Sequence, residues 1–181
     1  MTDGKIRINL RELRAGAGLS LSKAAEHTGV STARLGQSER GESSPTIATL
    51  WKLAKGFHLP LTAFLEGGPA PARVRFPGSI DVEPVFPFDP LLCCETFVVR
   101  LAPGQAHRSE AHDAGVTEDI YVTEGPLEVL ADGGWTRLET GGWLRFAADQ
   151  PHGYRAPQGQ GAGFLNTLHY PGRAGGGQII T

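Results

Sequence analysis

The apolar residues of this 181-residue chain change their spacing near residue 67, and no single class of secondary structure fits both parts. Before that point they recur every three or four residues, as on one face of an amphipathic helix. After it they fall in short runs separated by Gly, Pro and Asp, which is typical of antiparallel strands. The intervening Gly67-Gly68-Pro69-Ala70-Pro71-Ala72 has the composition of a linker. The pattern therefore predicts a helical domain followed by a domain of strands.

Five short helices are expected in the first domain, residues 1–66, and they predict a compact helical bundle. Each is bounded by a capping residue, a glycine or a proline. The first helix has an apolar face from Ile6 to Ala17, the second runs from the Ser20 cap to Thr28, and the third runs from Ser31 to about Arg40. The fourth begins at Ser44-Pro45-Thr46, and the fifth is short and ends near Leu65. The fourth is expected to bury Ile47, Leu50, Trp51 and Leu53.

The segment from Gly29 to Gly41 is typical of the second half of a helix-turn-helix. Gly29 can adopt the left-handed conformation that ends one helix, and Ser31 can cap the N-terminus of the next. The first turns of that helix offer short or polar side chains, namely Thr32, Arg34 and Gln37. Since Arg and Gln can form paired hydrogen bonds with guanine and adenine, this face is predicted to enter the major groove of DNA.

Other residues are expected to support that contact. Ser22 and Lys23 begin the second helix and Thr46 begins the fourth, where each can meet a phosphate, and the capping residue Ser31 is counted with them among the expected DNA-binding residues. Residues 1–66 hold nine Lys/Arg and six Asp/Glu, a net charge of +3, whereas residues 67–181 hold eight and thirteen, a net charge of −5. A charge of +3 predicts weak binding by one copy, so a homodimer on a near-palindromic site is expected.

Residues 19–56 resemble the XRE (lambda-repressor-like) helix-turn-helix family, most specifically over 35–52. Ala25 and Gly29 are the small residues expected where the two helices approach each other, and Val30 and Leu35 are expected in the core. The resemblance implies a DNA-binding domain. Ser38 departs from it, because the family usually has an apolar residue there.

The second domain, residues 74–172, is predicted to be a β-sandwich or barrel, with a disordered tail at 173–181. The residues between the domains, 67–73, are assigned to the linker. Eight strands are expected, at Arg73–Phe76, Val82–Phe86, Cys94–Leu101, Ile120–Thr123, Leu127–Leu130, Trp135–Leu138, Trp143–Phe146 and Phe164–His169.

Three residues of this domain have the chemistry of a metal site. His112, Glu118 and His152 lie near predicted strands that a barrel can bring together, and two imidazoles with one carboxylate suit zinc, iron, manganese or nickel. Alternatively, the same side chains line a pocket and hydrogen-bond an organic ligand with no metal.

The surrounding segments resemble the two motifs of the cupin fold, a double-stranded β-helix of the jelly-roll type. Glu118 and Gly125 keep the motif spacing, and His112 and His152 fall on its histidines. Ala114 and Ala156 stand where the family has a second histidine and an asparagine. The resemblance implies three of four ligands for one divalent metal, with zinc the leading candidate.

Four more residues are candidates for a ligand pocket, because they lie on or beside predicted strands and can bind a carboxylate or line the barrel mouth: Arg100, Arg145, Tyr154 and His169. His27, His58 and His107 have no partner at a suggestive spacing and are expected at the surface.

Helix-turn-helix, linker and cupin together resemble a class of bacterial transcription regulators, with segments closest to regulators of sulfur utilisation. That resemblance implies a double-stranded DNA operator as partner and a small-molecule effector in the cupin domain, with a sulfur-containing amino acid as the candidate. The alternative is a cupin metalloenzyme, a dioxygenase or isomerase, fused to a helical module. No signal peptide or membrane span is expected, so a cytoplasmic location is predicted.

Overall fold

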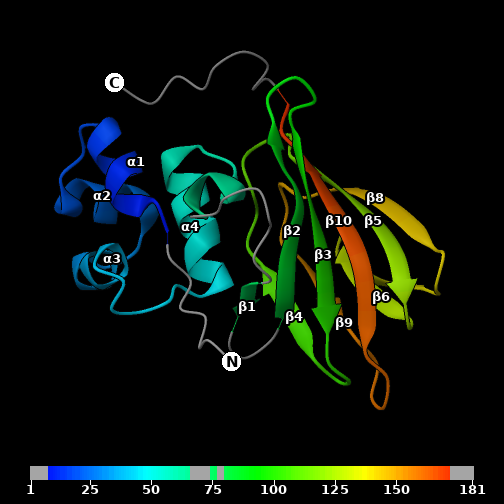
Figure 1. The fold of residues 1–181 in the computed structure, drawn as a ribbon. Helices are drawn as coiled ribbons and strands as arrows, with labels where there is room; N and C mark the ends of the chain where they lie inside the picture. The colour runs from blue at the N-terminus through cyan, green and yellow to red at the C-terminus, as the bar shows by residue number, and fades with distance from the viewer. Residues whose placement is uncertain (1–7, 66–73, 77–79, 172–181) are drawn as a thin grey trace. The chain divides into compact units, whose positions relative to one another are not determined.

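The computed structural model describes residues 8–65, 74–76 and 80–171, and for residues 74–76 only the backbone is described. Residues 8–65 belong to one compact unit, and residues 74–76 and 80–171 belong to another (Figure 1). The linker predicted at 67–73 and the tail predicted at 173–181 lie outside these residues. The domain boundaries therefore stay a prediction.

The helical unit contains α1 (Leu10–Gly16), α2 (Leu21–Thr28), α3 (Thr32–Glu39) and α4 (Ile47–Phe57). Helices α2 and α3 begin at the caps that the sequence predicts, and α4, expected to start within Ser44-Pro45-Thr46, has its cap at Thr46, so that Pro45 precedes the helix. The hydroxyl oxygens of Ser20, Ser31 and Thr46 each accept a hydrogen bond from the backbone N–H three residues later, at 3.2, 3.3 and 3.2 Å. Each cap satisfies one of the N–H groups that a helix leaves unpaired at its start. The caps thus fix where α2, α3 and α4 begin.

The fifth helix of the prediction is wrong. Leu61–Phe64 forms a single 3-10 turn, η1, whose backbone hydrogen bonds join residues three apart. Leu65 is already extended and forms an isolated antiparallel bridge with Ile8, so the chain leaves the helical conformation before an α-helical turn can close. The same bridge places Ile8 outside the first helix, which begins at Leu10.

The packing of the helices also differs in part from the prediction. Val30 and Leu35 are buried as expected, but Ala24 rather than Ala25 is buried in α2, and Trp51 is only half-buried. Exposed Gly29 ends α2 with a φ of 66°, and a Cβ there would meet nothing within 4 Å.

The close approach is made by a residue that the sequence does not single out, Gly56 of α4. A Cβ atom on Gly56 would lie 2.7 Å from Thr28 Cγ2 and 2.8 Å from the His27 carbonyl oxygen. The end of α2 therefore packs on the backbone of α4.

The second unit is built of antiparallel strands. The larger sheet has the order β1-β2-β3-β10-β5-β8 and the smaller one β4-β9-β6-β7. Figure 1 shows β2, β3, β10, β5 and β8 in this succession. The bounds are β1 Val74–Phe76, β2 Ile80–Asp89, β3 Cys94–Leu101, β4 Ala106–Ser109, β5 Thr117–Glu124, β6 Leu127–Ala131, β7 Gly134–Leu138, β8 Trp143–Ala147, β9 His152–Arg155 and β10 Ala162–His169.

Eight of these strands match the prediction, and β4 and β9 were missed. Alternate residues of the longer strands are buried, as in β3, where Phe97, Val99 and Leu101 enter the core. The polar Glu118 occupies such an inward position on β5, in line with Ile120 and Val122. No helix within the described residues is long and apolar enough to span a bilayer.

Candidate functional site

The exposed face of α3 holds the residues predicted to read DNA. Ser31, Thr32, Arg34 and Gln37 are exposed, whereas Leu35, Gly36 and Ser38 on the opposite face are buried. The hydroxyl group of Ser31 caps the helix. The side chains of Arg34 and Gln37 thus point outward from a helix whose opposite face is buried in the helical unit.

Backbone hydrogen bonds define the end of α3. The Gly41 N–H donates to the Ser38 carbonyl at 3.1 Å and the Glu42 N–H donates to the Gln37 carbonyl at 2.9 Å, with Gly41 at a φ of 65°. This is the Schellman arrangement, in which a left-handed residue closes the last helical turn.

An ion pair that the sequence does not reveal joins α3 to α1. The Arg14 guanidinium donates to both carboxylate oxygens of Glu39, at 2.6 and 3.0 Å, and to the carbonyl of Leu19 at 2.8 Å. The hydrogen bond to Glu39 raises the pKa of Arg14 above its ordinary value. Only 18% of the Arg14 side chain and 8% of the Glu39 side chain are exposed. The pair therefore fixes the C-terminal end of α3, at a separation of 25 residues that no local pattern can indicate.

The residues predicted to meet phosphates lie at two helix N-termini. Ser22 and Lys23 are exposed on α2, where the Lys23 ammonium pairs with Glu26 at 2.9 Å. Thr46 is half-buried, and its hydroxyl oxygen is shared between the backbone N–H of Thr49 and the Thr49 hydroxyl. Thr46 therefore positions the N-terminus of α4, whose backbone N–H groups favour an anion.

A second cluster forms inside the β-unit. His112 precedes β5, Glu118 lies on β5 and His152 begins β9. Glu118 Oε1 lies 3.0 Å from His112 Nε2 and 3.3 Å from His152 Nε2. One ligand atom from each of the three residues lies within 4.8 Å of the others. Residues up to 40 positions apart are thus brought to one point, as the motif spacing predicts.

The second oxygen of Glu118 is held by two side chains from other strands. The Tyr154 hydroxyl on β9 and the Asn166 amide on β10 both donate to Glu118 Oε2, the latter at 2.9 Å. Burial and the adjacent charge of Glu118 raise the pKa of Tyr154 well above its ordinary value, so the hydroxyl stays protonated and can donate. Oε1 is left facing the two imidazoles.

The charges in this cluster stabilise one another. Burial alone would raise the pKa of Glu118, but His112 and His152 outweigh it and hold the pKa well below its ordinary value. Burial disfavours the charged form of His152, yet the Glu118 carboxylate raises the pKa of this histidine. The cluster is therefore an ionised, almost fully buried carboxylate flanked by imidazoles, a combination suited to a cation.

Two buried polar atoms of the cluster form no hydrogen bond of good geometry among the described residues: Asn166 Oδ1, and His152 Nε2, which lies 3.3 Å from Glu118 Oε1 as an ion pair only. His152 Nδ1 faces the Gln150 carbonyl at 2.9 Å, so the hydrogen on this nitrogen can be donated there and Nε2 left to bind. Ligand atoms about 2.1 Å from a tetrahedral zinc ion are separated by ~3.4 Å, close to the distances at Glu118 Oε1. The donor set thus fits a divalent ion, and the two unpaired atoms equally fit a hydrogen-bonding ligand.

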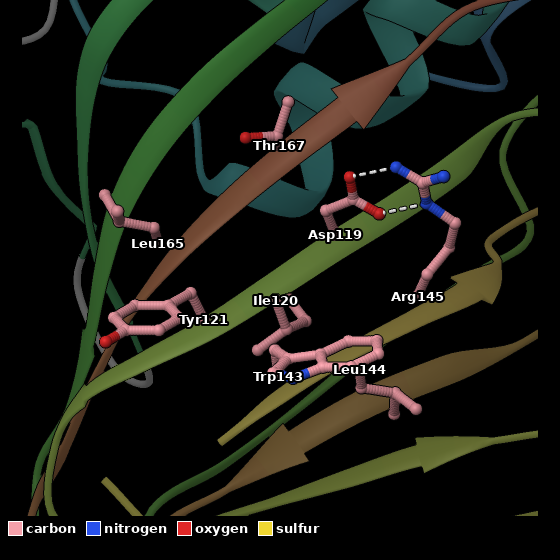
Figure 2. Close-up of a pocket in the computed structure, with 8 residues that line it drawn as sticks. All are labelled: Asp119, Ile120, Tyr121, Trp143, Leu144, Arg145, Leu165 and Thr167. Atoms are coloured by element: carbon pink, nitrogen blue, oxygen red, sulfur yellow. Dashed lines mark hydrogen bonds and ion pairs between the residues drawn. The ribbon is translucent and has the colours of Figure 1, made fainter. Parts of the chain in front are cut away.

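The four residues predicted to form a ligand pocket do not lie together. Tyr154 belongs to the cluster at Glu118, whereas Arg100 pairs with Glu83 at 3.2 Å. Arg145 and His169 both contact Asp119, the residue after Glu118, at 2.5 and 3.0 Å. Because successive strand residues point to opposite faces, Asp119 and these two partners lie on the outer face of the sheet. Figure 2 shows the pair of Arg145 with Asp119.

One of the three histidines expected at the surface is in fact buried. His107 on β4 pairs with Tyr154 across the β4–β9 ladder and is 9% exposed. Burial and the neighbouring His152 lower the pKa of His107, so it is neutral near pH 7. The prediction failed because β4 has four residues, too few for a visible alternation. His27 and His58 are exposed, as expected.

Comparisons with known proteins assign each of the two units to a family. Residues 10–64 match the family described as "Helix-turn-helix", and residues 97–167 match the family described as "Cupin domain". The HTH-type transcriptional regulator SutR of Escherichia coli (strain K12) is 43% identical over 169 residues, which are 90% of this chain and 93% of that protein.

Solved structures agree with this result. A HTH_3 family transcriptional regulator from Vibrio cholerae is 42% identical, with a TM-score of 0.81 over 90% of this chain and 93% of the other. The Cupin_2 domain of an XRE family transcriptional regulator from Enterobacter cloacae is 39% identical, with a TM-score of 0.50 over 52% of this chain and 99% of the other.

Proposed function

Because this chain belongs to the HTH-type transcriptional regulators that combine a helix-turn-helix with a cupin domain, we propose that it binds its operator as a homodimer under the control of a small effector. Membership of this family makes the chain a DNA-binding regulator and not a cupin metalloenzyme. Such a protein would act in the cytoplasm, where its DNA is.

The exposed polar face of α3 supports the DNA-reading part of the proposal. Arg34 and Gln37 would contact base edges, Thr32 would lie beside them, and Lys23 with Ser22 would contact the backbone phosphates. The N-termini of α3 and α4, at Ser31 and Thr46, would add phosphate contacts through backbone N–H groups.

A gel-shift titration with the protein's own promoter region tests this assignment. Arg34→Ala and Gln37→Ala should each weaken binding by about 1–3 kcal/mol and relax the preference for one base pair. Lys23→Ala should weaken binding to all sequences alike. Gln160→Ala, at an exposed glutamine of the β-unit, is the control and should change nothing. Absence of wild-type binding at low salt would contradict the proposal.

The cluster at Glu118 supports the effector part. His112, Glu118 and His152 would hold one divalent ion, with zinc the leading candidate, and the ion would supply an open coordination position for an effector. Zinc accepts sulfur ligands, which agrees with a sulfur-containing amino acid as effector. In the alternative, the effector itself pairs with His152 Nε2 and Asn166 Oδ1 and no metal is needed. Either ligand can change DNA binding only by its difference in affinity between two arrangements of the dimer.

Thermal unfolding and metal analysis separate these two forms of the site. Zinc should raise the unfolding midpoint of the wild-type chain and a chelator should reverse the shift. His152→Ala should abolish the shift, whereas the exposed His27→Ala should keep it. Cysteine or methionine that raises the midpoint of metal-free protein would favour the organic ligand. If neither zinc nor these amino acids shifts the midpoint, the effector site is not at Glu118.

A further inference from the structure

The outer face of the larger sheet carries two rows of side chains that run across three strands. The register of β10, β5 and β8 aligns Leu165 with Tyr121 and Trp143, and the neighbouring row aligns Thr167 with Asp119 and Arg145. We call these six residues the outer patch. They line an open groove of about 460 Å³, which Figure 2 shows with the Asp119–Arg145 ion pair.

The apolar row of the outer patch is unusually open to solvent. Trp143 is 74% exposed and Tyr121 is 49% exposed, although both lie in regular strands. Trp, Tyr and Arg are the residue types that contribute most to binding at protein interfaces, while Lys is depleted there. The outer patch holds one of each of the three favoured types and no Lys. Its composition is that of an interface centre.

Strand β8 gives a second reason to expect a protein partner. It lies at the end of the strand order, and within the described residues it pairs only with β5. Its free edge therefore presents unpaired backbone groups beside Trp143 and Arg145, without the Lys or Pro that protects solvent-exposed edge strands. Such an edge is a place where a strand of another chain can pair.

The charges of the outer patch point to a second copy of this chain. Asp119 lies between Arg145 and His169, with its carboxylate oxygens 2.5 and 2.6 Å from Arg145 and 3.0 Å from His169 Nε2. A patch that carries both signs side by side is complementary to its own two-fold image. A patch designed for DNA or for an acidic or basic partner would carry one sign.

We propose that the outer patch is the surface through which two copies of this chain form the dimer. The inference rests on the proposed function only in that a dimer brings two helix-turn-helix units to one operator. The aromatic row forms the buried centre of the contact, and Asp119 of each copy pairs with Arg145 of the other.

Complementary charge variants test this proposal in the full chain. D119R leaves the outer patch with only positive groups and R145D leaves it with only negative acids, so each alone should be monomeric in sedimentation velocity at concentrations where the wild type is dimeric. An equimolar mixture should recover dimers, and native mass spectrometry of chains with tags of different length should show them to be mixed. Only an interface between two copies of this patch predicts recovery on mixing.

A second pair of variants guards against misfolding of the charge variants. W143E should raise the dimer dissociation constant at least about 30-fold, as loss of an interface centre does. L91E is the matched control, because Leu91 is 90% exposed in the turn between β2 and β3 and outside the outer patch. Circular dichroism and the unfolding midpoint of each variant confirm that it is folded.

Three results would overturn the proposal: a monomeric wild type, charge variants that stay dimeric, or dissociation by L91E but not by W143E. If any of these is found while the gel-shift results at Gln37 and Arg34 hold, the interface is wrong and the DNA-reading function stands. If DNA binding fails while mixed dimers form, the proposed DNA-reading function is wrong and the interface stands.

Discussion

In the helical unit the backbone positions the candidate functional side chains, whereas in the β-unit these side chains position one another. Arg34 and Gln37 stand exposed on a helix that Ser31 caps and Gly41 ends. Glu118 is 1% exposed and contacts four side chains, those of His112, His152, Tyr154 and Asn166. The first arrangement leaves side chains available to a large external partner, and the second keeps a charge ready for a small one.

This difference predicts how substitutions divide between binding and stability. Changes at an exposed helix face should alter recognition and leave folding almost untouched. Changes in a buried ionic cluster should alter both, because each remaining group loses its partner.

Among these substitutions, removal of Glu118 should cause the largest loss of stability. A small loss would contradict the contrast drawn between the buried cluster and the exposed helix face. Glu118→Ala leaves buried His152 and its neighbours without their counter-charge, so we expect a loss of about 3–5 kcal/mol in the free energy of unfolding of the β-unit. Urea titration followed by tryptophan fluorescence measures it. Glu139→Ala, in the exposed pair with Arg137, is the control and should cost less than about 1 kcal/mol.

The helical unit has one buried ion pair of its own, between Arg14 and Glu39, and it should behave like the β-unit. Arg14→Met should cost about 2 kcal/mol, because the carboxylate of Glu39 is 8% exposed and loses its partner. Helicity at 222 nm during thermal unfolding measures the loss. Arg137→Met, at a guanidinium that is 53% exposed, should have almost no effect. Equal effects would show that the Arg14 pair is open to water in solution.

Two glycine substitutions test whether close backbone packing supports the helical unit. Gly56→Ala would place a Cβ 2.7–2.8 Å from Thr28 and His27, so we expect a loss of about 1–3 kcal/mol. Gly16→Ala meets nothing within 4 Å and should be neutral or stabilise by up to about 1 kcal/mol. Differential scanning calorimetry compares the two. A stabilising Gly56→Ala would contradict the close approach of α2 and α4.

The smallest loss of stability is expected at the partly exposed pair of Glu128 and Arg155. It contrasts with the large loss expected at the buried Glu118 of the same unit. The hydrogen bond from Arg155 lowers the pKa of Glu128 in the folded state. The contribution of this pair to the free energy of unfolding is therefore fully present above the pKa of Glu128 in the unfolded chain, about 4.3. It is lost as the pH falls through the lower pKa of the folded state. Glu128→Gln should cost less than about 1 kcal/mol at pH 6 and still less at pH 3. A difference that grows toward pH 3 in urea titrations would contradict this sign.

The sequence predicts the parts of this molecule that local chemistry determines. For α4 the pattern gives only a start within Ser44-Pro45-Thr46, and the cap lies at Thr46. The caps at Ser20 and Ser31, the left-handed Gly29 and the helix end at Gly41 lie where the pattern places them. Each depends on residues within one helical turn, so a single segment contains all the information.

The missed features depend on pairs that are distant in the chain. The ion pair of Arg14 with Glu39 and the hydrogen bond of Tyr154 with Glu118 join residues 25 and 36 positions apart. Strand β9 has four residues and three consecutive buried positions, so it lacks the alternation that reveals a strand. His107 lies on β4, which also has four residues, too few for a visible alternation, so the sequence does not reveal its burial.

Strand β5 places Glu118 on the inner face and the adjacent Asp119 on the outer face of the same sheet. One peptide bond therefore separates the carboxylate of the proposed effector site from the carboxylate at the centre of the proposed dimer contact. Any tilt or slide of this strand displaces both groups together, so no relay of intervening side chains is required. The path between the proposed effector site and the proposed dimer contact is then no longer than the thickness of one strand.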